Sequence, residues 1–583
     1  MVAASGSRQR RSSTLSITRP STSYDKFLPL VVIGIGFLLR LIVASTTYLD
    51  PDEAVNYFQG NQKSLWDVYH ASLGSMHPPL LLFCIYSLKA LGRSEFALRL
   101  PSVIAGTLSC WFGYKWLSKV ADDTIALSGA VLFSLVPPLF SLESEVRQYS
   151  LLLLFIMAAF YFLESALEKL SVREMLLFSA ALWLGLSVQY SALLFTVCIG
   201  IYTLLRFDEL RSGSRFIVAW VFGQLVFVGL ALFFYKTHVP VFERGISGSW
   251  LRKLFYHSGD PVVSFLATNT YRFFHFLFGQ PVIGSIMLLL FVIGLVSLVT
   301  GRHFPIRVSR PIGFTSMFAA VLCWALSLGG IYPFGGTRHT IFLLPFVVLA
   351  AVVGLVTLLG NYAKFAPTVA AGMALVCILA PVPAGPSIRP PQQSLTFMHR
   401  AVTYVRQTVP AGEMVLVDQQ SVFPFRYYFC RDDVFPFRQN PQNFECGGYR
   451  VYRSDVEWLL SAEHLESEVS AARRAFGAPP AERVLLFQTG WSVNNQKDLR
   501  DKLRASGCTS QWAFGKNIIA CDIGVPDRRM FSAGRSTSKW STHLSSGTGE
   551  REICECRARR SQSTNCGPCV SGSVGIVPSV RFR

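Results

Sequence analysis

Long apolar runs recur along the chain, each of about 20 residues with few charges, and short polar segments separate them. Such a run is typical of a helix that spans a membrane. The pattern predicts eleven spans. They cover residues 27–46, 97–117, 124–141, 149–168, 174–189, 190–206, 215–235, 281–300, 311–330, 338–358 and 364–383.

A shorter apolar run at residues 80–91 contains Lys89 and fits a helix lying along the membrane interface better than a span. This assignment decides on which side each later loop falls. It places the Lys and Arg residues of the short loops together with the N-terminus, on the side that the positive-inside rule assigns to the cytoplasm. The segments around residues 52, 77, 147 and 338 then share the outer face.

The N-terminal residues 1–26 are rich in Arg, Ser and Thr and predict a disordered, basic cytoplasmic arm. A cleaved signal peptide is the alternative for the first apolar run. That run is long for a signal peptide, and many further runs follow it, so a membrane-spanning helix is the favoured interpretation.

The pattern changes after the last span. Residues 384–393 form a Pro-rich linker, and residues 394–526 predict a small α/β domain with helices at 394–407 and 496–505 and strands at 414–418 and 483–488. The fold class is therefore an all-α polytopic membrane domain, residues 27–383, followed by a small extracytoplasmic α/β domain that caps or docks on its outer face. On that side the domain's four cysteines can form two disulfides. They are Cys430, Cys446, Cys508 and Cys521.

Residues 527–583 are rich in Ser, Arg, Gly and Thr and predict a disordered tail. Four cysteines in the tail allow a redox motif or a zinc site, but no surrounding strand–helix pattern supports either. They are Cys554, Cys556, Cys566 and Cys569. We assign no function to this tail.

Composition agrees with a membrane protein, since 51% of the residues are hydrophobic and only 15% are charged. The net charge of +19 does not indicate nucleic-acid binding, because much of it lies in the termini and short loops. We expect a multi-pass protein of the plasma (inner) membrane, with its N-terminus cytoplasmic and its C-terminal domain extracytoplasmic.

The stretch that follows the first span carries the strongest chemical signal. Asp50, Asp52 and Glu53 place three carboxylates within four residues at a membrane exit. Such charges are costly near hydrocarbon unless they have a function or stay in water. We predict that Asp52 is a catalytic base and that Glu53 supports it. In the alternative, these residues only cap the next helix.

Other polar residues on the outer face supply candidate partners. His77, Arg147 and Arg338 are candidates to stabilise a departing lipid phosphate, with Tyr149 beside them. Alternatively, His77 is a plain interfacial side chain, and the two arginines anchor helices at the head groups.

Glu145 and His339 are predicted to support this set. No group of residues has the spacing of a metal site, so we predict no metal ligands and no certain cofactor. A divalent cation held by Asp52, Glu53 and His77 through the fold stays an open alternative.

Four short motifs resemble, in order, those of the dolichyl-phosphate-mannose–protein mannosyltransferase and aminoarabinose transferase superfamily. They are Asp52-Glu53-Ala54, His77-Pro78-Pro79-Leu80, the segment 92–102 and Glu145-Val146-Arg147-Gln148-Tyr149. The resemblance covers roughly residues 27–360 and is closest to bacterial members that act on envelope glycans. Those proteins are membrane glycosyltransferases of the GT-C fold.

This resemblance implies transfer of a sugar, with inversion, from a polyprenyl-phosphate donor to an extracytoplasmic glycan, lipid or protein. Asp52 matches the base, Glu53 its support, and Arg147 the arginine associated with the lipid phosphate. His77 stands where other members have Lys, and Arg338 with His339 resembles a basic pair before a late span. The C-terminal domain is unlike that of the protein mannosyltransferases, so the acceptor stays open. A transporter or flippase and a non-catalytic scaffold remain alternatives.

Overall fold

The computed structural model describes most of the chain. The described residues are 27–73, 75, 77–210, 213–238, 254–301, 309–380, 394–432, 434, 441–456, 460–480, 482–490, 497–505 and 518–523. The predicted arm 1–26, linker 384–393 and tail 527–583 lie outside them.

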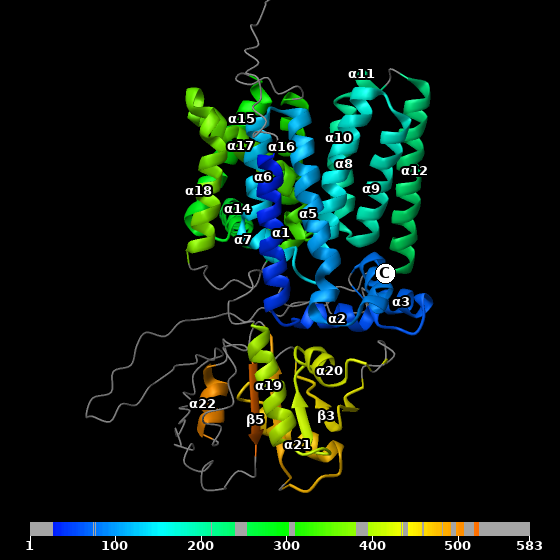
Figure 1. Cartoon of the computed structure of the whole chain (residues 1–583), viewed down its shortest axis with the longest axis vertical. Helices are drawn as coiled ribbons and strands as arrows, with labels where there is room; N and C mark the ends of the chain where they lie inside the picture. Colours follow the sequence, from blue (N-terminus) through cyan, green and yellow to red (C-terminus); the bar gives the residue numbers. More distant parts are fainter. Residues whose placement is uncertain are drawn as a thin grey trace, which may run out of the picture. The chain divides into compact units, whose positions relative to one another are not determined.

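Each predicted span contains a helix, and Figure 1 shows the long helices running alongside one another. In the described part, seven helical segments are long and apolar enough to cross a membrane. The chain is thus a membrane protein. Its helices at the predicted spans are α1 (Leu28–Thr46), α5 (Glu95–Val120), α6 (Asp123–Leu135), α7 (Pro137–Leu142), α8 (Tyr149–Lys169), α9 (Val172–Val188), α10 (Ser191–Leu204), α12 (Ser214–Thr237), α15 (Pro281–Thr300), α16 (Ser309–Leu328), α17 (Leu344–Leu359) and α18 (Ala366–Leu379).

Short helices connect several of these elements. Between α1 and α5 lie α2 (Pro51–Gly60), α3 (Leu65–Ser72), α4 (Leu80–Ser87) and the 3₁₀ helix η2 (Leu88–Leu91). Further along the chain are α11 (Phe207–Leu210), η4 (Arg338–Leu343) and η5 (Gly360–Phe365). Figure 1 shows α2 and α3 at one end of the long helices.

Two predicted elements differ from the structure. The predicted span 124–141 is divided into α6 and α7, because Pro137 and Pro138 lack the amide hydrogens that would continue the helix. The predicted loop 236–280 contains α14 (Val262–Phe278). Polar residues such as Arg272 and His275 interrupt its apolar pattern, so its sequence does not look like a span.

A buried ion pair explains the charge in the middle of α1. Arg40 is fully buried and pairs with Glu143, which follows α7. Its guanidinium also donates to the carbonyl oxygens of Phe133 at 3.1 Å and Ser134 at 3.2 Å. Gly106 of α5 leaves room for the pair, since a Cβ there would lie 3.0 Å from Arg40 Nε. The charge is therefore paired inside the bundle, and a helix with this charge still packs among apolar neighbours.

The C-terminal region folds around a five-stranded sheet of order β2-β3-β1-β4-β5. The strands are β1 (Met414–Val417), β2 (Asn443–Cys446), β3 (Tyr449–Arg453), β4 (Val484–Thr489) and β5 (Ile518–Ile523). The central strand β1 is parallel to β3 and β4, while the edge strands β2 and β5 are antiparallel to their neighbours. Gly447 and Gly448 both have positive φ, as a two-residue turn between β2 and β3 requires.

Helices cover both faces of this sheet. One face packs on α19 (Leu395–Thr408) and α20 (Val422–Cys430), and the other on α21 (Leu465–Ala475) and α22 (Lys497–Ala505). The predicted helices and strands of this region are present to within a few residues. The hydropathy pattern did not predict α20, α21, β2, β3 or β5.

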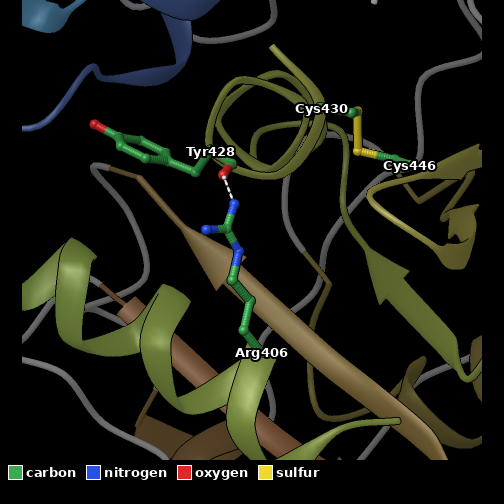
Figure 2. Close-up of a disulfide and its surroundings, with 4 residues drawn as sticks. All are labelled: Arg406, Tyr428, Cys430 and Cys446. Carbon is green, nitrogen blue, oxygen red and sulfur yellow. Dashed lines mark hydrogen bonds between the residues drawn. A yellow bond between two sulfur atoms is a disulfide. The ribbon is translucent and has the colours of Figure 1, made fainter. Parts of the chain in front are cut away.

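A disulfide between Cys430 and Cys446 joins the end of α20 to β2, and Arg406 of α19 donates to the carbonyl oxygen of Tyr428 at 3.1 Å (Figure 2). Cys521 is also disulfide-bonded. Cys508, another of the four cysteines predicted to form disulfides, lies outside the described residues.

Candidate active site

Helix α2 begins with a capping box that fixes its first turn. The side chain of Asp50 accepts a hydrogen bond from the backbone N–H of Glu53 at 2.9 Å, and Glu53 accepts one from the backbone N–H of Asp50 at 3.1 Å. Pro51 takes the first helical position, where no amide hydrogen is needed. Asp52 is the next residue, and the rigid turn sets the direction of its side chain.

Glu53 lies in the interior of the protein. Its carboxylate accepts hydrogen bonds from Arg99 Nε at 2.9 Å and Arg99 Nη2 at 2.7 Å, and from the backbone N–H of Val146 at 2.8 Å. Both Glu53 and Arg99 are fully buried. Glu53 therefore joins α2 to α5 and to the turn before α8.

Arg99 also fastens the end of α1. It donates to the carbonyl oxygens of Ala44 at 2.9 Å, Thr47 at 2.5 Å and Tyr48 at 2.8 Å. These carbonyls belong to the last turn of α1 and the segment after it, and a guanidinium there satisfies acceptors that the helix leaves unpaired. Arg99 belongs to the motif at residues 92–102, for which no individual role was predicted. Its signal was a charge within the first turns of a span-length helix.

Asp52 meets two arginines from distant parts of the chain. Arg147, in the turn before α8, and Arg338, at the start of η4, both pair with its Oδ2 atom. Arg338 Nη2 lies 2.7 Å from that oxygen, and 27% of the Asp52 side chain remains exposed. The tertiary fold thus brings together three of the predicted site residues around one carboxylate.

Tyr149 lies next to both guanidinium groups. The Arg147 and Arg338 guanidinium carbons are 5.9 and 5.8 Å from the centre of its ring. A cation over an aromatic face is attracted by the ring's quadrupole, so Tyr149 helps to hold the two like charges close together. This contact places the fourth predicted residue in the same cluster.

His77 contacts two glutamines on the same side. Its Nδ1 lies 2.8 Å from Gln189 Oε1, and its Nε2 lies 2.9 Å from Gln148 Nε2. Burial, together with the nearby charge of Arg338, lowers the pKa of His77 to about 4. The ring is therefore neutral near pH 7, so it does not add a third positive charge beside the arginines.

The two supporting residues also lie in this neighbourhood. Glu145 Oε2 is 4.0 Å from Arg147 Nε. His339 follows Arg338, and its carbonyl oxygen accepts a hydrogen bond from the Tyr332 hydroxyl at 2.6 Å. No role was predicted for Tyr332, Gln148 or Gln189, because neutral side chains between helices carry no distinctive pattern.

The part of the chain that the structure describes contains no cluster of three or more His, Cys, Asp or Glu side chains that could hold a metal ion. Around Asp52 the structure instead supplies guanidinium groups, which stabilise negative charge without a metal. The arrangement can hold an anion at the arginines and offers a partly exposed carboxylate as a proton acceptor.

A cavity of about 520 Å³ lies between α19, α20 and the first turn of α5. Its walls include Glu95, His399, Arg406, Tyr428 and Arg431. None of the predicted site residues lines it. The cavity is therefore distinct from the cluster around Asp52.

Residues 76–235 match the family model described as dolichyl-phosphate-mannose-protein mannosyltransferase. The match confirms, for less than half of the chain, the resemblance to GT-C glycosyltransferases. It includes His77, Arg147 and Tyr149, whereas Asp52 and Arg338 lie outside it. No curated protein matches the sequence.

Several solved membrane-enzyme structures show similarity to this chain. ArnT from Cupriavidus metallidurans bound to undecaprenyl phosphate is 11% identical, with a TM-score of 0.48, covering 85% of this chain and 97% of that one. AglB from Archaeoglobus fulgidus is 9% identical, with a TM-score of 0.42, covering 80% and 70%. The S. cerevisiae Pmt1–Pmt2 complex is 18% identical, with a TM-score of 0.30, covering 41% of this chain but only 36% of the yeast chain. At TM-scores below 0.5 these similarities support no conclusion about this chain.

Proposed function

We propose that the protein is an inverting glycosyltransferase that moves a sugar from a polyprenyl-phosphate donor to an extracytoplasmic glycan, lipid or protein. The observation that carries the proposal is the meeting of Asp52 with Arg147 and Arg338. One proton acceptor and two phosphate-binding groups in one cluster are what such a transfer needs. The matched family, whose description names a phosphate-linked mannose donor, supports this assignment.

The proposed reaction is a single displacement. An acceptor hydroxyl oxygen attacks the anomeric carbon of the sugar as the bond from that carbon to the phosphate oxygen breaks. Asp52 takes the hydroxyl proton, and the polyprenyl phosphate leaves with the bonding electron pair. Arg147 and Arg338 stabilise the negative charge that develops on the phosphate.

Binding of the donor would redistribute the contacts of the two arginines. In the structure both guanidinium groups pair with Asp52 Oδ2. The phosphodiester of the donor offers the same groups two non-bridging oxygens, and their transfer to the phosphate makes Asp52 a better proton acceptor, because the nearby positive charges then face another anion. Asp52 is thus most basic when the donor is in place.

The remaining residues position these three. Tyr149 keeps the guanidinium groups together, Glu145 and His339 flank the two arginines, and Glu53 fixes α2 through Arg99. We place the site on the extracytoplasmic face of the plasma (inner) membrane, with the N-terminus inside. The Cys430–Cys446 disulfide supports this orientation, since cytoplasmic thiols are kept reduced.

The test compares Asp52→Asn with the unaltered full-length protein in lipid vesicles. Loss of a general base lowers the rate by about 10²- to 10⁴-fold. Transfer from undecaprenyl-phosphate sugars to envelope glycan should fall by this factor. Binding of bare undecaprenyl phosphate should stay equal or tighten, because a neutral amide competes less for the arginines.

Asp67→Asn is the matched control, since Asp67 is an exposed carboxylate in the first turn of α3. It should change neither transfer nor binding. Full transfer activity in Asp52→Asn would overturn the proposed role of Asp52. Movement of the lipid across vesicles without any transfer would favour the transporter alternative.

A further inference from the structure

The three-residue sequence Gln-Tyr-Ser occurs at two helix starts. Gln148 precedes the first residue of α8, Tyr149, whereas Gln189 and Tyr190 precede the first residue of α10, Ser191. Both segments lie next to η4, which packs against both helices. The repeat therefore supplies two similar sets of neutral hydrogen-bonding groups near Arg338.

His77 joins the two glutamines and fixes their orientation. The neutral ring has one N–H, which can be donated to Gln189 Oε1 at 2.8 Å, and its Nε2 then accepts from Gln148 Nε2 at 2.9 Å. The side-chain amide nitrogen of Gln148 is the donor in this contact. Its Oε1 atom is buried and has no hydrogen-bond partner among the described residues.

Two more polar atoms of these segments are in the same condition. Ser150 Oγ and the Tyr190 hydroxyl are buried without a hydrogen-bond partner in the described part of the chain. Buried polar groups in proteins are nearly always paired, and exceptions frequently mark a place where a ligand or water binds. Three such atoms from a repeated segment indicate a binding surface.

Contacts link this surface to the cluster around Asp52. The ring of Tyr149 lies under the guanidinium groups of Arg147 and Arg338. On the other side, Ser191 interacts with Tyr332, whose hydroxyl donates to the carbonyl oxygen of His339. Gln148 and Ser150 are the sequence neighbours of Tyr149, and Tyr190 is the sequence neighbour of Ser191, so the unpartnered atoms belong to residues that adjoin these contacts.

We infer that the two Gln-Tyr-Ser segments bind the hydroxyl groups of the transferred sugar, and that this sugar carries no charge. This inference rests on the proposed function. The charged groups of the cluster have other roles in the proposed reaction, since Arg147 and Arg338 hold the phosphate and Asp52 takes the proton of the acceptor.

The two Gln-Tyr-Ser segments and His77 supply only amides, hydroxyls and a neutral imidazole. An ammonium group on the sugar would need a carboxylate there, and a carboxylate on the sugar would need a cation. Hydroxyls need only donors and acceptors, which this surface has.

The experiment measures binding and transfer of three lipids by the full-length protein in vesicles. They are bare undecaprenyl phosphate and two undecaprenyl-phosphate sugars that differ at one carbon, with a hydroxyl in one and an amino group in the other. The hydroxyl sugar should bind and react at least about tenfold better than the amino sugar.

Ser150→Ala removes one of the unpartnered hydroxyls. Loss of one hydrogen bond to the sugar should weaken binding of the hydroxyl-sugar lipid about three- to tenfold and leave binding of the bare lipid unchanged. Ser187→Ala is the matched control, because the Ser187 hydroxyl donates to the carbonyl oxygen of Trp183 within α9. It should change neither.

Gln148→Glu tests the charge argument. The new carboxylate should shift the preference between the two sugar lipids by at least about tenfold toward the amino sugar. Preference of the unaltered protein for the amino sugar, or equal weakening of bare and sugar-bearing lipid by Ser150→Ala, would overturn the inference and leave the proposed function standing. Failure to bind or transfer from either sugar lipid would overturn both.

Discussion

Asp52 and Glu53 are neighbours on one turn of α2, yet their carboxylates lie in opposite surroundings. Glu53 is fully buried, and Arg99 and the Val146 amide occupy its oxygens. Asp52 keeps 27% of its side chain exposed, and both of its arginine contacts fall on the same oxygen. A buried, saturated pair is suited to holding structure, and a partly exposed carboxylate with exchangeable partners is suited to chemistry.

The difference arises from where the partners are attached. Arg99 is itself fixed by three backbone carbonyls at the end of α1, so it cannot move to a ligand without leaving acceptors unpaired. Arg147 and Arg338 face a carboxylate that a phosphate can replace. We therefore expect the ion pairs of Asp52 and Glu53 to have different roles, because only the Glu53–Arg99 pair is enclosed by further hydrogen bonds.

The largest expected effect is a loss of stability when the buried Glu53–Arg99 ion pair is broken. Glu53→Gln leaves the buried guanidinium of Arg99 without its counter-charge, which typically costs about 3–5 kcal/mol. Thermal unfolding of the purified protein in detergent should show a large drop in stability. Asp52→Asn, measured in parallel, should unfold close to the unaltered protein. Equal losses in both variants would remove the distinction between the two carboxylates.

A smaller effect should come from His77, through pH. Its pKa is lowered from 6.5 to about 4 in the folded protein, so between these values the unfolded chain binds a proton that the folded chain does not. Stability should therefore fall as the pH drops from about 6.5 to 4, by up to about 3 kcal/mol, and should level off below that range.

His77→Gln should reduce the slope of stability against pH in this range. The measurement is the difference between the unfolding free energies of the unaltered protein and the variant as the pH is varied. His238, whose pKa burial also lowers to about 4, is present in both proteins and cancels in that difference. Identical slopes would show that His77 is not held neutral by the fold.

Loss of an arginine that pairs with Asp52 should weaken lipid binding rather than lower the stability of the protein. Arg338→Ala removes a charge-assisted contact worth about 1.5–3 kcal/mol, so binding of undecaprenyl phosphate should weaken by about 10- to 100-fold. Arg93→Ala is the control, because Arg93 pairs with the exposed Asp432, and exposed pairs contribute little. Unchanged lipid binding in Arg338→Ala would argue against the phosphate site.

The smallest effect concerns the far end of α2. The Tyr57 hydroxyl donates to the carbonyl oxygen of Arg431 at 2.8 Å. Tyr57→Phe should cost about 1 kcal/mol, the usual contribution of one neutral hydrogen bond. Thermal unfolding would measure it, and transfer activity should stay within about twofold. A large loss of activity would show that this contact also positions Asp52.

Much of the fold could be read from the sequence, because membrane-spanning helices and short strands leave strong local patterns. The split between α9 and α10 at Gln189 agrees with the structure, and the α19 and β1 positions do also. Helix α14 could not be read, since its polar residues hide a helix that neighbouring helices stabilise. Likewise, the charge of Arg40 gave no indication of its partner Glu143.

The sequence by itself determined that this is a membrane protein whose C-terminal region contains strands, and it supplied the residues to which we assign the chemistry. Only the tertiary structure decided which adjacent carboxylate is enclosed and which is open, and it held His77 neutral between Gln148 and Gln189. The physical reason is that hydropathy and capping depend on residues close along the chain. Ion pairing and burial depend on segments as distant as residues 52, 147 and 338, which only the folded chain brings together.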